Sequence, residues 1–170
     1  MSTMYLIRHA DAGEPWEYPK DDNERPLSRH GREQAKEMAS LIKDFNISQI
    51  FTSFADRCQE TAQYLARETR AKAEPSAMLT QNRGNVVTSF LRTIPHEPTV
   101  VVTHSDNIYA FLKTIHDDDK VEIPPRIAVP CGSFYVVQRA TTVFTSVKYV
   151  PPGVPPEAPE FDEADDGWVV

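Results

Sequence analysis

The segment Thr99-Val100-Val101-Val102-Thr103 constrains the fold more than any other part of the sequence, because it is an unbroken run of β-branched residues. A strand with one face in water alternates apolar and polar side chains, whereas a strand covered on both faces is apolar throughout. The segment therefore predicts a central strand in a sheet that has helices on both of its faces.

Further strands and helices are expected on either side of this segment. Apolar stretches predict four more strands, at 4–7, 49–52, 132–137 and 143–150, and a short edge strand near 72–77. Between them, apolar residues recur at helical spacing within 35–45, 58–65, 86–94 and 108–115, and Ser28 is placed to cap the first of these helices. The order predicts an α/β fold, a three-layer α/β/α sandwich with a mostly parallel central sheet. Two long loops remain, at 10–27 and at 116–131, and the second is expected to hold Asp117–Asp119 as a solvated turn.

The 170 residues suit one domain, which we place at 1–150, followed by an acidic, proline-rich tail at 151–170. Removing the six acids of the tail from the formal net charge of −7 leaves −1 for the domain. A domain this close to neutral lacks the basic footprint of a nucleic-acid-binding protein, so we expect no nucleic-acid partner. The tail is either a solvated extension or an arm that contacts its own domain or a partner.

Other features bear on the setting and the chemistry. The sequence has no apolar run of membrane-spanning length, and Met1-Ser2-Thr3 does not begin a signal segment, so we expect a cytoplasmic protein with no membrane partner. Cys58 and Cys131 are expected to be free thiols. No metal-binding spacing is evident, and we expect neither a metal nor a cofactor.

The ends of three predicted strands carry the residues best suited to chemistry. Arg8 and His9 follow the first strand, Arg57 lies in the segment after the second, and His104 follows the valine-rich strand. Open α/β sheets bind ligands beyond the carboxyl ends of their strands, and the two later segments also begin helices, whose N-termini favour anions. Arginine forks match phosphate oxygens, and clustered positive charge keeps a histidine neutral and nucleophilic. The sequence therefore predicts a phosphate site that acts through a histidine.

Three motifs resemble those of the histidine phosphatase superfamily. Leu6-Ile7-Arg8-His9-Ala10 is similar to its Arg-His-Gly motif, with alanine in place of glycine. The stretch 53–62, SFADRCQETA, is similar to Ser-Pro-x-x-Arg-x-x-Gln-Thr-Ala, and 101–108 resembles the strand that leads to the second histidine.

The resemblance implies a phosphoglycerate mutase-like fold and a role for each residue. His9 would be the nucleophile that becomes phosphohistidine, Arg8 and Arg57 would hold the phosphoryl oxygens, and His104 would complete the phosphate site and stabilise the transition state. The segment 22–31, DNERPLSRHG, is also similar to an element of the small SixA-type phosphohistidine phosphatases. This similarity implies a phosphorylated protein as substrate, and a small phosphate ester is the alternative.

One role is unfilled in this comparison. Most members of the family supply a carboxylic acid between the second and third motifs to protonate the leaving group, but this interval offers only Gln81, Asn82 and Arg83. Asp11 and Asp106 are the remaining candidates, and for Asp106 a helix-capping role is favoured.

Three hypotheses about function stay open at this point. The first is a metal-independent phosphatase that works through phospho-His9. The second is a module that binds phosphorylated ligands without turnover, which the unfilled role suggests. The third is a metal-dependent hydrolase that uses His9, Asp11 and His104.

Overall fold

A computed structural model describes residues 1–156. Residues 157–170 of the expected tail lie outside this range, and they include its six acidic residues, Phe161 and Trp168. Within residues 1–156, no helix is both long and apolar enough to cross a membrane.

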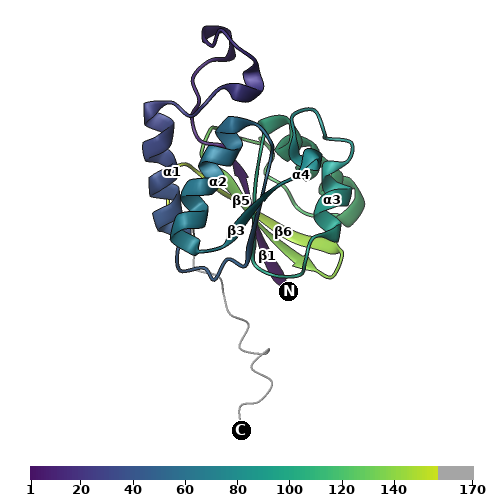
Figure 1. The fold of residues 1–170 in the computed structure, drawn as a ribbon. Helices are drawn as coiled ribbons and strands as arrows, with labels where there is room; N and C mark the ends of the chain where they lie inside the picture. The colour runs from purple at the N-terminus through teal and green to yellow at the C-terminus, as the bar shows by residue number, and fades with distance from the viewer. Residues whose placement is uncertain (157–170) are drawn as a thin grey trace.

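The centre of the fold is a six-stranded sheet with the strand order β3-β2-β4-β1-β5-β6 (Figure 1). Its strands are β1 (Ser2–Arg8), β2 (Gln49–Thr52), β3 (Lys72–Pro75), β4 (Thr99–Thr103), β5 (Phe134–Ala140) and β6 (Val143–Val150). The first four strands pair in parallel, whereas β5 pairs antiparallel with β1 and with β6. The expected mostly parallel sheet is therefore confirmed, with an antiparallel hairpin at one side.

Helices cover both faces of this sheet: α1 (Arg29–Ile42) and α2 (Asp56–Thr69) on one, α3 (Val87–Thr93) and α4 (Ser105–Asp119) on the other (Figure 1). The valine-rich strand explains the layering. Val100 and Val102 pack in the core cluster that includes α1 and α2, while Val101 packs in the cluster that includes α3 and α4. All five residues of β4 are buried, so the prediction of a strand covered on both faces, and of a three-layer sandwich, is confirmed.

Two element boundaries differ from the sequence prediction. Helix α4 continues through His116 to Asp119 and ends where Lys120 adopts a left-handed backbone, so the expected solvated turn is wrong. The Asp119 carboxylate instead accepts hydrogen bonds from Arg92, at 2.8 and 2.9 Å. Strand β5 begins at Phe134, because the N–H of Gly132 is used in a turn that contacts the Arg8 and His9 carbonyls.

The loop after β1 contains two short 3₁₀ turns, η1 (Pro15–Glu17) and η2 (Asp22–Glu24), and stands out from the rest of the fold (Figure 1). Its base is fixed to the start of α1. As expected, Ser28 caps this helix by accepting the N–H of Gly31, and Ser28 also donates its own N–H to the Asp11 carbonyl at 2.9 Å. A Cβ at Gly31 would lie 1.8 Å from that carbonyl oxygen, so the close approach of loop and helix requires glycine here.

Candidate active site

The site lies where three neighbouring parallel strands end at one edge of the sheet. In the register, Arg8 of β1 pairs with Thr103 of β4, and Thr52 of β2 pairs with Val102. The residues that directly follow β1, β2 and β4 are therefore His9, Ser53 and His104. This placement follows from topology, because β4 lies between β2 and β1 in the sheet.

His9 is buried, and its orientation is fixed by a single hydrogen bond. Its Nδ1 lies 2.8 Å from the Ala10 carbonyl oxygen, which can only accept, so Nδ1 carries the proton. The lone pair of the neutral ring is then on Nε2. This is the tautomer that a nucleophilic histidine needs. Ala10 is absent from the described residues with positive φ, so alanine fits where the family motif has glycine.

His104 lies beside His9 and contacts two polar groups. The ring centroids of the two histidines are 5.5 Å apart. Nε2 of His104 lies 2.8 Å from Ser53 Oγ, and Nδ1 lies 3.4 Å from an Arg57 Nη2, which can only donate. Because Nδ1 accepts here, Nε2 carries the proton and donates to Ser53 Oγ. In the other neutral tautomer, Nδ1 carries the proton and Nε2 accepts a hydrogen bond from the Ser53 hydroxyl.

Arg57 is the largest fully buried side chain among the described residues, and its contacts leave one donor unused. Nη1 donates to the Asp22 carbonyl at 2.7 Å, and Nη2 donates to Gln81 Oε1 at 3.3 Å and pairs with Asp22 Oδ2 at 3.2 Å. Arg8 Nη1 donates to the Val129 carbonyl at 2.6 Å.

Both arginines keep a buried Nε–H for which the described residues provide no hydrogen-bond acceptor. Buried donors of this kind are rare unless a ligand completes them. Two such guanidinium donors next to His9 and His104 fit an anion with several acceptor oxygens.

The electrostatics keep both histidines neutral. Burial lowers the pKa of His9 well below its ordinary value, and the charges of His104, Arg57 and Arg8 lower it further, against the hydrogen bond to Ala10. Burial and then Arg57 lower the pKa of His104 to about 4. Both rings therefore carry a lone pair at neutral pH.

The two carboxylates expected near the site each accept a hydrogen bond from another group, although Asp106 Oδ1 is buried without a hydrogen-bond partner among the described residues. The Asp11 carboxylate accepts a hydrogen bond from the Ser28 hydroxyl at 2.5 Å. Asp106 does not cap α4, contrary to the prediction, because His104 occupies the N-cap and Asp106 Oδ2 accepts the N–H of Asn82 at 2.6 Å.

Two residues that contact Arg57, Asp22 and Gln81, are not singled out by the sequence patterns. Gln81 lies in the interval where an acid is expected, and Asp22 lies in the segment that resembles the SixA-type element. Their contacts with Arg57 could not be predicted from sequence separation, because both residues lie in irregular loops rather than at periodic positions of an α-helix or strand.

The expected free thiols are confirmed, since Cys58 and Cys131 are both unpaired. Burial raises the pKa of the Cys58 thiol to about 12, so it does not ionise beside His104. Among residues 1–156, no group of three or more histidine, cysteine, aspartate or glutamate side chains is arranged to hold a metal ion.

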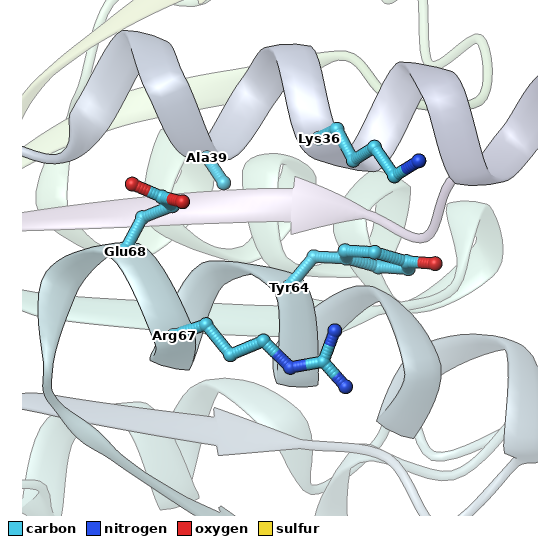
Figure 2. Close-up of a pocket in the computed structure, with 5 residues that line it drawn as sticks. All are labelled: Lys36, Ala39, Tyr64, Arg67 and Glu68. Carbon is cyan, nitrogen blue, oxygen red and sulfur yellow. The ribbon is translucent and has the colours of Figure 1, made fainter.

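A hollow of about 240 Å³ lies between α1 and α2 (Figure 2). It is lined by Lys36, Ala39, Tyr64, Arg67 and Glu68. The Arg67 guanidinium lies over the Tyr64 ring, 5.4 Å from its centroid, so its charge already has a partner.

Comparison with known proteins gives this geometry its context. Residues 4–81 match the family model described as histidine phosphatase superfamily, branch 1, and this stretch includes Arg8, His9 and Arg57. Over these residues the chain is similar to the histidine phosphatase superfamily. The structure adds His104, which lies beyond the matched stretch, to the same cluster.

Among curated proteins, the 8-oxo-(d)GTP phosphatase of Mycolicibacterium smegmatis is 30% identical over 79 residues. The match covers 46% of this chain and 24% of that protein, so the chain spans about a quarter of the relative's length.

Solved structures share the fold over nearly the whole chain. The protein histidine phosphatase SixA complexed with tungstate has a TM-score of 0.72 at 16% identity and covers 90% of this chain and 97% of its own. A SixA structure from Agrobacterium tumefaciens has a TM-score of 0.73 at 22% identity, with 88% and 97% covered. A mycobacterial glucosyl-3-phosphoglycerate phosphatase with VO₃ has a TM-score of 0.63 at 13% identity, with 88% and 97% covered. These likenesses show the phosphoglycerate mutase-like fold that the sequence predicts.

Proposed function

We propose that the protein is a metal-independent phosphatase that forms a covalent phosphohistidine on His9. The observation that carries the proposal is the pair of buried Nε–H groups of Arg8 and Arg57, which find no acceptor within residues 1–156, beside two neutral histidines. An anion with several oxygens is the ligand that this arrangement would satisfy, and a lone pair on His9 Nε2 is available to attack it.

In the proposed reaction, His9 Nε2 attacks phosphorus, the N–P bond forms and the bond to the leaving group breaks. Water then attacks the phosphohistidine and releases inorganic phosphate. Arg8 and Arg57 hold the equatorial oxygens, whose charge they stabilise through the transition state. In the tautomer that carries its proton on Nδ1, His104 donates to the phosphoryl group through Nδ1 while Nε2 accepts a hydrogen bond from the Ser53 hydroxyl. The His9 Nδ1–H bond to Ala10 keeps the nucleophile oriented throughout.

For the substrate we propose protein phosphohistidine, because the 22–31 segment is similar to the SixA-type element and the loop it belongs to is anchored at Arg57. A small phosphate ester is the second candidate. The similarity to a protein named 8-oxo-(d)GTP phosphatase favours it. Parallel assays with a histidine-phosphorylated protein and a panel of small phosphate monoesters will distinguish the two by kcat/KM.

The nucleophile is tested by replacing it. His9→Ala should abolish hydrolysis of an aryl phosphate, and an alkaline quench of the wild-type reaction should trap a phosphorylated peptide that contains His9, detected by mass spectrometry. His30→Ala is the matched control, because His30 is an exposed histidine on α1 and should retain full activity. Turnover by His9→Ala at the wild-type rate would refute the mechanism.

Two further measurements separate the remaining hypotheses. Activity that survives a chelator is expected, whereas loss of activity with a chelator and its return with a divalent cation would favour the metal-dependent hydrolase. Titration calorimetry with vanadate tests the binding module, since tight binding with no turnover of any substrate would favour it over a phosphatase.

A further inference from the structure

We propose that Asp22 is the general acid that protonates the leaving group. This inference rests on the proposed phosphatase function and assigns the role that the interval between the second and third motifs leaves unfilled. The carboxyl group would reach the reaction from the loop after β1 instead of from that interval.

The first support is where the Asp22 carboxylate lies. Its Oδ2 is 3.2 Å from Arg57 Nη2, and Arg57 Nη2 is 3.4 Å from His104 Nδ1, so the carboxylate borders the phosphoryl-binding groups directly. The Asp22 side chain is 42% exposed, whereas that of Arg57 is 1% exposed. A phosphoryl group held by the buried residues must carry its leaving group on the solvent side, and Asp22 is on that side.

The second support is that the other nearby groups are unsuited to this role. The Asp11 carboxylate faces the Ser28 hydroxyl. Asp106 Oδ2 faces the Asn82 N–H, and Asp106 Oδ1, which has no partner among the described residues, is buried away from the solvent that must return a proton to a general acid. Gln81 contacts the same Arg57 nitrogen as Asp22, at 3.3 Å, but an amide has no acidic proton to give. Asp22 and Gln81 therefore share one guanidinium nitrogen from two different loops, and only one of them can act as an acid.

The third support concerns the proton. In the free protein, burial would raise the pKa of the Asp22 carboxyl, but the hydrogen bond from Arg25 and the charges of Arg57 and Arg25 outweigh it and lower the pKa. A bound phosphoryl dianion would take over Arg57 and place negative charge beside the carboxylate. Both changes favour the protonated acid, so Asp22 takes up a proton from solvent as substrate binds.

The proton balance then closes over one turnover. For a phosphate monoester, the electrons of the breaking P–O bond go to the leaving oxygen when His9 Nε2 attacks, and this oxygen takes the proton of the Asp22 carboxyl. For protein phosphohistidine, the breaking bond is P–N, and the leaving imidazole nitrogen takes the proton. The resulting carboxylate accepts a proton from the water that attacks phospho-His9. The products are the protonated leaving group and inorganic phosphate, and Asp22 is again protonated.

The test compares substrates that differ only in how much the leaving group needs a proton. For Asp22→Asn, kcat/KM should fall about 100-fold or more for phenyl phosphate, yet change by less than about threefold for 2,4-dinitrophenyl phosphate, whose leaving group departs without protonation. A plot of log kcat/KM against the pKa of the leaving group should be steeper for Asp22→Asn than for the wild-type protein. The matched control is Asp21→Asn, which removes a charge from the same turn but not the Arg57 contact, and it should leave the slope unchanged.

A second variant tests the same inference if Asp22→Asn loses activity because its folding or the position of Arg57 has changed. Gln81→Glu places a carboxyl on the other group that contacts Arg57 Nη2, so the double variant Asp22→Asn with Gln81→Glu should recover activity toward phenyl phosphate. The loop should stay in place in both variants, because the Asp22 carbonyl and the Arg25 side chain hold it independently of the carboxylate.

The outcomes are distinct. A uniform loss across the substrate series would make Asp22 a positioning residue for Arg57 and overturn the inference. A uniform gain would mean that the carboxylate only competes with phosphate, which also overturns it. If no variant, including wild type, gives turnover that depends on His9, the proposed function itself fails, and the inference with it.

Discussion

Replacing Gly31 with alanine should destabilise the protein, although the same change normally strengthens a helix. In an exposed helix interior, glycine to alanine gains about 1 kcal/mol. Here the added Cβ would lie 1.8 Å from the Asp11 carbonyl oxygen and 2.8 Å from its carbon, where ordinary contact begins at 3.4 Å. These are backbone atoms, so a side-chain rotation cannot relieve the overlap.

The size of the effect follows from what must move. Forcing a methyl group into a filled space costs about 1–3 kcal/mol. Moving the Asp11 segment away from α1 also weakens the hydrogen bonds that Ser28 donates to it from its N–H and its hydroxyl, at about 1 kcal/mol each. After the helical gain is subtracted, the net loss is about 2–4 kcal/mol, which lowers Tm by about 4–16 °C in a protein of this size.

Thermal and urea unfolding followed by circular dichroism measure this loss, with Ser40→Ala as the control. Ser40 is exposed on the same helix, so its replacement should raise stability by a few tenths of a kcal/mol through helix propensity alone. Turnover should also fall in Gly31→Ala, because Asp11 follows His9 by two residues. A Tm for Gly31→Ala at or above the wild-type value would refute the reasoning.

Two further predictions concern the histidines. In the unfolded chain, histidines bind protons below about pH 6.5, whereas burial lowers the pKa of folded His9 and His104. Stability should therefore be full above that pH and fall on acidification by up to about 1.4 kcal/mol per pH unit for each histidine. Urea titrations at pH 7.5, 6 and 5 measure this decline, and an unchanged decline in His104→Gln would contradict the reasoning. Ser53→Ala removes the hydroxyl at 2.8 Å from His104 Nε2 and should lower kcat about tenfold. It should also cost about 1–3 kcal/mol of stability, because the buried Nε2–H loses its acceptor. An unchanged kcat for an aryl phosphate would exclude this positioning role.

Much of the fold could be predicted because it depends on local patterns. The β-branched run at 99–103 could only be buried on both faces, and its valines do divide between the two core clusters. The boundaries that failed depend on single backbone conformations. A left-handed Lys120 ends α4 later than the apolar pattern indicates, and a turn at Gly132 delays β5.

The residues of the candidate site were also predictable only where a regular element places them. Arg8, His9, Arg57 and His104 were predictable because the ends of parallel strands meet at one edge whatever the loops do. Asp22 and Gln81 were not, since their contacts with Arg57 arise from the folding of two aperiodic loops. Asp106 was misassigned because a capping rule considers only the residue type, whereas His104, engaged with Ser53, takes the N-cap position in an extended conformation.

The hairpin formed by β5 and β6 provides a turn at which the protein should tolerate insertions and sequence changes. Its tight turn at 141–142 joins strand ends that lie beside Ser2, at the edge of the sheet opposite to Arg8 and His9. The length of β1 separates the two edges, about 20 Å for a strand of this size. Loop length and sequence can therefore diversify at that turn without disturbing the chemistry, which makes it a natural insertion point for a tag, a fluorophore or a second domain.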